Sequence, residues 1–235
     1  MIYKFLSLIT VCLLSVNANN ASLDKTKTLA SASKSAFEMK AESLFASLDP
    51  NNLELPKLDS FEEALKGFYL LKEEGKVKND ILTIVDFSLS STTKRLWVID
   101  MSTGKILFHS LVAHGKNSGD DYANVFSNKN ESFKSSLGFY ITGEVYNGKH
   151  GLSLKLDGQE KGVNDNARCR SVVMHGADYV SDWFIKSHNR LGRSQGCPAI
   201  PMELTADIIN TLKNGSCLYI HHQSRIKKDI FGSLS

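Results

Sequence analysis

Two residues in this sequence suit nucleophilic chemistry, and each lies at or near a boundary between polar and apolar segments. Cys197 is in the polar turn GRSQGCPAIP, and His175 ends the apolar run SVVMH. A thiol reacts as its thiolate, so catalysis by cysteine needs a neighbouring base to take the proton or a cation to stabilise the charge. The two residues therefore predict a catalytic pair in which Cys197 is the nucleophile and His175 is its base.

The backbone of the same turn offers hydrogen-bond donors. In a glycine-containing turn, the N–H groups around Ser194, Gln195 and Gly196 can point at negative charge that develops on a substrate oxygen. An ion pair with His175, together with these donors, would lower the pKa of Cys197 below the ordinary value of about 8.5. We therefore predict an oxyanion site in this turn and a thiol more acidic than usual.

Other residues compete for these roles. His114, in LVAHGKNSG, is a rival base among the seven histidines. Cys169 and Cys217 lie in strand-like runs, and we interpret them as passive residues that either stay free or pair with each other. The sequence lacks the closely spaced ligand pairs of a zinc site and the glycine-rich loop of a phosphate site. It therefore predicts neither a metal nor a cofactor.

The beginning of the sequence predicts export. Residues 1–18 have the pattern of a secretory signal peptide, with a basic residue near the start, an apolar run and the cleavage signal Val16-Asn17-Ala18. Residues 19–35 are poor in large apolar side chains, which is typical of a flexible tether. No later run has the length of a membrane span, so we expect no stable membrane insertion. The net charge is +3 with scattered basic residues, which disfavours nucleic-acid binding.

The elements that must position the pair follow from the patterns after the tether. Residues 36–79 predict a small helical element, with a capping box at Ser60 and Glu63 and a helix stop at Gly75. Residues 80–235 predict a mainly β domain with one late helix, roughly residues 202–213. Its expected strands lie in ILTIVDFS, KRLWVID, KILFHSLVAHG, LGFYITGEVY, LSLKLDG, RSVVMHG and CLYIHH.

Several separated segments resemble one enzyme family. VVMHGADYVS followed by GRSQGCPAIP is similar to the active-site segment of murein L,D-transpeptidases, the YkuD-like family, in the branch whose cysteine turn reads G-C-P-A. The resemblance continues upstream through NVFSN, SSLGFYITGEVY, GLSLKLDG and VNDNARCRS, and it covers roughly residues 80–222. It implies a β-sandwich or barrel-like catalytic domain of mainly β structure, preceded here by the small helical element.

The resemblance also implies a reaction. Cys197 would attack the bond between the third and fourth residues of a peptidoglycan stem peptide, release D-alanine, and pass the acyl group from a thioester to an acceptor amine. This implies an acyltransferase in the periplasm or cell-wall space. Two alternatives remain open: a carboxypeptidase or related peptidoglycan hydrolase that uses the same Cys/His site, and a non-catalytic cell-wall binding module. The sequence does not indicate an oligomeric state.

The sequence departs from the more familiar family pattern beside the cysteine. Gln195 stands where that pattern has a histidine, and the apolar PAIP stands where it has an arginine. We expect Arg193 to supply the missing cation. Arg168 and Arg170 alternate as they would on one face of a strand, where either a bound carboxylate or plain solvation would explain them. Further candidate substrate contacts are Gly176, Asn128 and Ser136.

Overall fold

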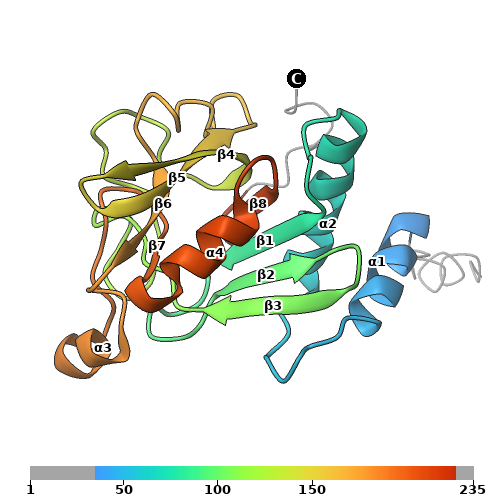
Figure 1. Cartoon of the computed structure of the whole chain (residues 1–235), viewed down its shortest axis with the longest axis horizontal. Coiled ribbons are helices and arrows are strands. Elements are labelled where there is room, and N and C mark those ends of the chain that lie inside the picture. Colours follow the sequence, from blue (N-terminus) through green and yellow to red (C-terminus); the bar gives the residue numbers. More distant parts are fainter. Residues whose placement is uncertain (1–34, 226–235) are drawn as a thin grey trace, which may run out of the picture. The chain divides into compact units, whose positions relative to one another are not determined.

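The computed structural model describes residues 35–225 (Figure 1). The predicted signal peptide, residues 1–18, lies outside the described residues, as does the predicted tether up to residue 34. The described chain forms eight strands, four α-helices and one short 3-10 helix, with two of the helices before the first strand. The predicted mainly β fold with a preceding helical element is therefore confirmed. Within residues 35–225, no helix has the length and hydrophobicity needed to cross a membrane.

The two N-terminal helices are α1, Ala36–Ala46, and α2, Leu58–Glu73. The predicted capping box is wrong, because α2 begins before Ser60 and has Lys57 at its N-cap position. The Ser60 hydroxyl donates a hydrogen bond to the Lys57 carbonyl oxygen at 2.9 Å. The predicted stop is confirmed, because Gly75 follows the helix with φ +69, a conformation that glycine adopts without strain.

The strands form one sheet with the order β3-β2-β1-β8-β4-β5-β6-β7. Seven of them overlap the runs that the sequence predicts, with β4, β5 and β6 extending one or two residues beyond them, whereas β7 and helix α3, Asp182–His188, were not predicted. The predicted late helix is present as a 3-10 turn, η1, Met202–Leu204, followed by α4, Thr205–Leu212. The strand bounds are β1 Ile81–Asp86, β2 Leu96–Asp100, β3 Lys105–Ser110, β4 Gly138–Gly148, β5 Gly151–Gly158, β6 Val173–Ala177, β7 Ala199–Pro201 and β8 Cys217–His221.

The two faces of the sheet bury different helices. On β8, Cys217 and Tyr219 lie in a buried cluster with the apolar side of α2, whereas Leu218 and Ile220 lie in a second cluster with α4. This division follows from the strand geometry, since successive side chains point to opposite faces. Figure 1 shows α4 in front of the sheet, and the strands that it contacts most are β5 and β6. Strand β8 is thus buried from both sides.

The ends of the sheet approach each other near its last strand. β7 runs parallel to β6, and the segment after β3 forms a bridge to it through Ala113 and Ala199. The Ala113 N–H donates to the Ala199 carbonyl at 2.8 Å. A second bridge joins Gly115 to Ser194. The chain on either side of Cys197 is therefore held where the two ends of the sheet meet.

Candidate active site

The turn that carries Cys197 is braced by its own residues. The Ser194 hydroxyl donates to the Cys197 carbonyl at 2.6 Å and accepts the Gly196 N–H at 3.0 Å. Gly196 has φ +121, and a Cβ atom there would lie 2.9 Å from the Lys134 carbonyl oxygen. Glycine is required at this position because both the backbone conformation and the space exclude a side chain.

Two neighbouring segments hold the turn from outside. The Ser194 N–H donates to the His114 carbonyl at 3.0 Å, and the Lys116 N–H donates to the Ser194 carbonyl at 2.8 Å. On the other side, the buried Ser135 hydroxyl donates to the Gly196 carbonyl at 3.3 Å. These contacts fix the backbone of the nucleophile before any ligand binds.

The sulfur of Cys197 lies against the start of β6. The Val173 N–H donates to Sγ at 3.5 Å, and the Ser171 carbonyl lies 3.8 Å from Sγ as an acceptor for the thiol proton. Burial raises the pKa of Cys197 above its ordinary range, although the Val173 N–H and the positive charges of Arg170 and Lys149 act in the opposite direction. The predicted lowering of the Cys197 pKa is therefore wrong for the free protein.

His175 lies in the middle of β6, next to the cysteine turn. Its register partner on β7 is Ala199, two residues after Cys197. Its Nδ1 lies 2.9 Å from the Gly176 carbonyl oxygen. Because a carbonyl can only accept, this contact assigns the proton to Nδ1 and leaves the Nε2 lone pair free. In the described chain, the two side chains are neighbours through the strand register and make no direct hydrogen bond.

A second imidazole covers the ring of His175. His150, at the exposed tip of the β4–β5 hairpin, stacks on it with ring centroids 4.5 Å apart and an angle of 19° between the planes. Burial lowers the pKa of His175 below 6.5, and the neighbouring His150 and Lys149 lower it further, against the opposing hydrogen bond to Gly176. His175 is therefore neutral near neutral pH, as a base must be.

His114, the rival base, is engaged elsewhere. Its Nδ1 accepts a hydrogen bond from the guanidinium of the buried Arg95 at 2.8 Å. Burial, followed by the charge of Arg95, lowers the pKa of His114 to about 4. Its contribution to the cysteine turn comes from the backbone carbonyl that accepts the Ser194 N–H.

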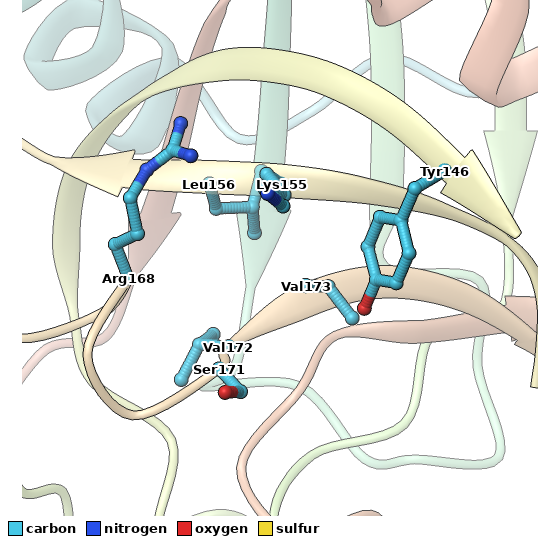
Figure 2. Close-up of a pocket in the computed structure, with 7 residues that line it drawn as sticks. All are labelled: Tyr146, Lys155, Leu156, Arg168, Ser171, Val172 and Val173. Carbon is cyan, nitrogen blue, oxygen red and sulfur yellow. The ribbon is translucent and has the colours of Figure 1, made fainter. Parts of the chain in front are cut away.

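A pocket of about 220 Å³ is lined by residues of β4, β5, β6 and the turn before β6, and neither Cys197 nor His175 is among them. Ser171 and Val173, whose backbone groups contact Sγ, form part of its lining (Figure 2). Its cations are paired, because Glu144 accepts from Lys155 at 2.7 Å and from Arg168 at 3.0 Å. The pocket thus combines a charged side with an apolar one. Its lining residues are Tyr146, Lys155, Leu156, Arg168, Ser171, Val172 and Val173.

Two of the expected substrate contacts bind or pack against other parts of the protein. Arg193, expected to supply a cation to the site, pairs with Asp120 at 3.0 Å and donates to the Gly119 carbonyl at 3.0 Å. Gly176 packs beneath α4, where an added Cβ would lie 2.2 Å from Thr205 Oγ1. Gln195, by contrast, is exposed beside the nucleophile.

The other two expected contacts join loops. The amide of Asn128 donates to the Asp165 carboxylate at 2.6 Å. Ser136 is buried, and its hydroxyl accepts from Tyr140 at 2.9 Å and from Arg170 at 3.0 Å. Both residues therefore have structural partners in the protein itself.

All three cysteines among residues 35–225 are free. Cys217 is buried in β8, as its strand-like run predicts, but Cys169 lies exposed in a turn. Because residues 161–171 form turns, Arg168 and Arg170 do not share a strand face. Within residues 35–225, no group of three histidine, cysteine or acidic side chains is arranged to hold a metal ion.

Sequence reasoning missed Lys149 and His150, and it considered Arg170 only as a strand residue that alternates with Arg168. Lys149 and His150 lie at a hairpin tip, and Arg170 lies in an irregular turn. Their proximity to Cys197 and His175 depends on the sheet order, and no local pattern in the sequence reports it.

Comparison with known families gives one match over most of the chain. The model of the L,D-transpeptidase catalytic domain matches residues 54–221. The matched region includes α2 and all eight strands. No protein of curated function matches the chain in sequence.

Several solved structures are similar at low sequence identity. An L,D-transpeptidase from Mycobacterium smegmatis aligns with a TM-score of 0.38 and 13% identity over 61% of this chain and 59% of that one. An Enterococcus faecium L,D-transpeptidase mutant gives 0.36 and 12% over 61% and 50%. A helical cell shape determining protein from Campylobacter jejuni gives 0.39 and 16% over 69% and 56%. The chain thus spans 50–59% of the length of these three structures.

Proposed function

The chain belongs to the L,D-transpeptidase catalytic domain family, and on that premise we propose that it transfers an acyl group from a peptidoglycan stem peptide through Cys197. The observation that carries the proposal is the arrangement around the sulfur. A braced cysteine lies beside a histidine whose Nδ1 is held by the Gly176 carbonyl, which keeps Nε2 available as a base. The proposal places the protein in the periplasm or cell-wall space, exported by the predicted signal peptide.

The first half of the reaction forms a thioester. His175 Nε2 takes the thiol proton as Sγ attacks the carbonyl carbon of the third stem residue. The bond from this carbon to the D-alanine nitrogen breaks, and the departing nitrogen takes the proton back from His175. Because burial raises the pKa of Cys197 and lowers that of His175, the pair begins as neutral thiol and neutral imidazole. His175 therefore acts as a general base during the attack.

The second half returns the enzyme to its starting state. An acceptor amine attacks the thioester carbon, His175 takes a proton from the amine, and the carbon–sulfur bond breaks. The proton then passes from His175 to the sulfur. The product is an amide between the third stem residue and the acceptor, which is the crosslink formed by L,D-transpeptidation.

Two backbone donors of the turn are suited to the oxyanion. The Gly196 N–H is already used by the Ser194 hydroxyl. Among the described residues, the N–H groups of Gln195 and Cys197 have no hydrogen-bond acceptor. They are therefore the donors that we assign to the developing negative charge, with Ser194 holding the turn in shape.

We assign the donor peptide to the pocket that Ser171 and Val173 help to line, because backbone groups of both residues contact Sγ. Val172 and Val173 offer an apolar wall, and the hydroxyl of Tyr146 points toward Val173 in Figure 2. Lys155 and Arg168, each paired with an acidic residue, line the other side. A peptide that carries both charged and apolar groups matches this lining.

The test is incubation of the purified protein with a disaccharide tetrapeptide, followed by mass spectrometry. We expect crosslinked dimer and free D-alanine from the wild type and from Cys169→Ala, which removes an exposed thiol outside the site. Cys197→Ala should give neither product. His175→Ala should slow the reaction by about 10²–10⁴-fold because it removes the base.

Each other outcome revises the proposal. Tripeptide without dimer would replace transfer by hydrolysis at the same cysteine. Crosslinking that persists in Cys197→Ala would overturn the nucleophile assignment. A wild type that binds the substrate and leaves it unchanged would make the chain a binding module.

A further inference from the structure

We propose that Arg170 is a positioning residue for Cys197: its guanidinium holds the cysteine turn in place and supplies the positive charge that stabilises the thiolate. The inference rests on the proposed function, because it takes Cys197 as the nucleophile. It also assigns a site for the cation that the sequence led us to expect from Arg193.

Arg170 is clamped to the loop of residues 127–136. Nη1 donates to the Ser127 carbonyl at 2.9 Å and to the Ser136 hydroxyl at 3.0 Å. Nη2 donates to the Lys134 carbonyl at 2.6 Å and to the Ser132 hydroxyl at 3.3 Å. Four hydrogen bonds from one side chain fix the guanidinium, which a planar fork of donors makes possible.

The charge of Arg170 is left uncompensated by this clamp. All four acceptors are neutral, and within residues 35–225 no carboxylate forms an ion pair with Arg170. Arg168, two positions earlier, pairs instead with Glu144 and Asp157. Because an unpaired charge that is half-buried is poorly screened, it acts strongly on a nearby ionisable group.

The guanidinium of Arg170 packs against Gly196, the residue that precedes Cys197. A Cβ atom on Gly196 would be 3.3 Å from Arg170 Nη2 and 2.9 Å from the Lys134 carbonyl oxygen that Arg170 binds. From the same loop, the Ser135 hydroxyl donates to the Gly196 carbonyl. Arg170 therefore shapes the surface against which the cysteine turn rests.

Few positively charged side chains affect the pKa of Cys197. Arg170 and Lys149 are the two whose charges lower the pKa of Cys197 against the effect of burial. Lys149 is on an exposed hairpin tip, where solvent screens it, whereas Arg170 is half-buried and fixed. Arg193 is paired with Asp120. Arg170 is thus the cation best placed to favour the thiolate when His175 takes the proton.

The experiment measures the rate of Cys197 alkylation by iodoacetamide against pH, with peptide mapping. Arg170→Gln should raise the apparent pKa of Cys197 by about 0.5 to 1 and slow alkylation at neutral pH about three- to tenfold, because less thiolate is present. Arg170→Lys should keep the pKa close to that of the wild type, since the charge remains. Arg168→Gln is the matched control, and we expect it to leave the Cys197 pKa unchanged.

An unchanged Cys197 pKa in Arg170→Gln would overturn the proposal, as would an equal rise in Arg168→Gln. Circular dichroism reports whether each variant is folded. Should Arg170→Gln not fold, Arg170→Lys decides, because a rise of about one in its Cys197 pKa would contradict a role for charge. The measurement needs no stem peptide. A protein that shows the Arg170 effect and yet does not act on the tetrapeptide would refute the proposed function without refuting this assignment.

Discussion

Burial acts on the two residues of the proposed catalytic pair in opposite directions. It raises the pKa of Cys197 and lowers the pKa of His175, so the proton stays on sulfur in the free protein. A neutral pair avoids holding two charges in a poorly solvated site. It also means that the reaction requires neutral His175 and a thiol that loses its proton during the attack. The acid limit of activity should therefore follow the titration of His175.

His150 contributes to the lowered pKa of His175, on whose ring it stacks. Removing it in His150→Ala should expose His175 to solvent and remove a neighbouring charge, and both changes raise the His175 pKa toward the ordinary 6.5. Because activity requires the neutral base, the acid limb of kcat/KM against pH should move to higher pH. The measurement is the pH profile of tetrapeptide turnover.

His188→Ala is the matched control for that profile. His188 is also an exposed imidazole stacked on an aromatic ring, that of Phe184, with centroids 4.1 Å apart. It lies at the end of α3, so its removal should leave the acid limb in place. An acid limb that is the same in His150→Ala and the wild type would contradict the role given to the hairpin tip.

At the residue scale, the sequence predicts the members of the pair better than their surroundings. A cysteine in a polar turn and a histidine at the end of an apolar run are visible as local patterns. The role of Arg170 is not, because alternation with Arg168 predicts a strand. The chain instead turns there, with Ser171 at φ +54. A left-handed serine has no sequence signal comparable to that of glycine.

At the element scale, one expected substrate contact has a packing role. Gly176 of β6 faces α4 closely enough that a Cβ would lie 2.2 Å from Thr205 Oγ1 and 2.9 Å from Met202 Sδ. Gly176→Ala should therefore lower the free energy of unfolding by about 1–3 kcal/mol through overpacking. Urea unfolding measures this change.

Thr205→Ala tests the cause of that loss. It removes the hydroxyl nearest the added methyl group, although it also removes the hydrogen bond to the Pro201 carbonyl at 2.9 Å. The double variant should consequently be more stable than the sum of the two single changes predicts. Strict additivity would mean that the close approach of β6 and α4 is not what requires glycine.

The elements themselves follow largely from local patterns, and the exceptions have physical reasons. The seven expected runs contain strands because β-branched and aromatic residues alternate within turn-bounded segments. β7 has three residues, Ala199–Pro201, too few to show a period. The capping box failed at Glu63, whose carboxylate contacts β8 instead of the helix start. Tertiary contacts thus overrode the local signal.

At the scale of the whole domain, the sheet order is the part that the sequence could not predict. β1 pairs in parallel with β8, so Leu82 lies opposite Cys217. The bridge between Ala113 and Ala199 likewise joins distant segments. Hydrophobic periodicity reports which face of a strand is buried and not which strand lies beside it. The cysteine turn, the histidine strand and the hairpin tip meet through these pairings.

The contact of α2 with β8 should make the stability of the domain sensitive to acid. Burial alone would raise the pKa of Glu63, but hydrogen bonds with His221 at 3.1 Å and Tyr219 at 2.6 Å hold it below 4.5. A carboxylate with a lowered pKa contributes stability above its unfolded-state pKa and loses it as the pH falls through the folded-state value. Glu63→Gln should therefore cost about 1–3 kcal/mol at neutral pH, with a difference from the wild type that shrinks below pH 4.5. Urea unfolding across this range measures it.

Glu73→Gln, at an exposed position of the same helix, is the control variant, and its stability should differ little from that of the wild type at either pH. The loss of unfolding free energy in Glu63→Gln could instead stay constant as the pH falls below 4.5. That result would show that packing, and not the charge of Glu63, stabilises the contact between α2 and the sheet.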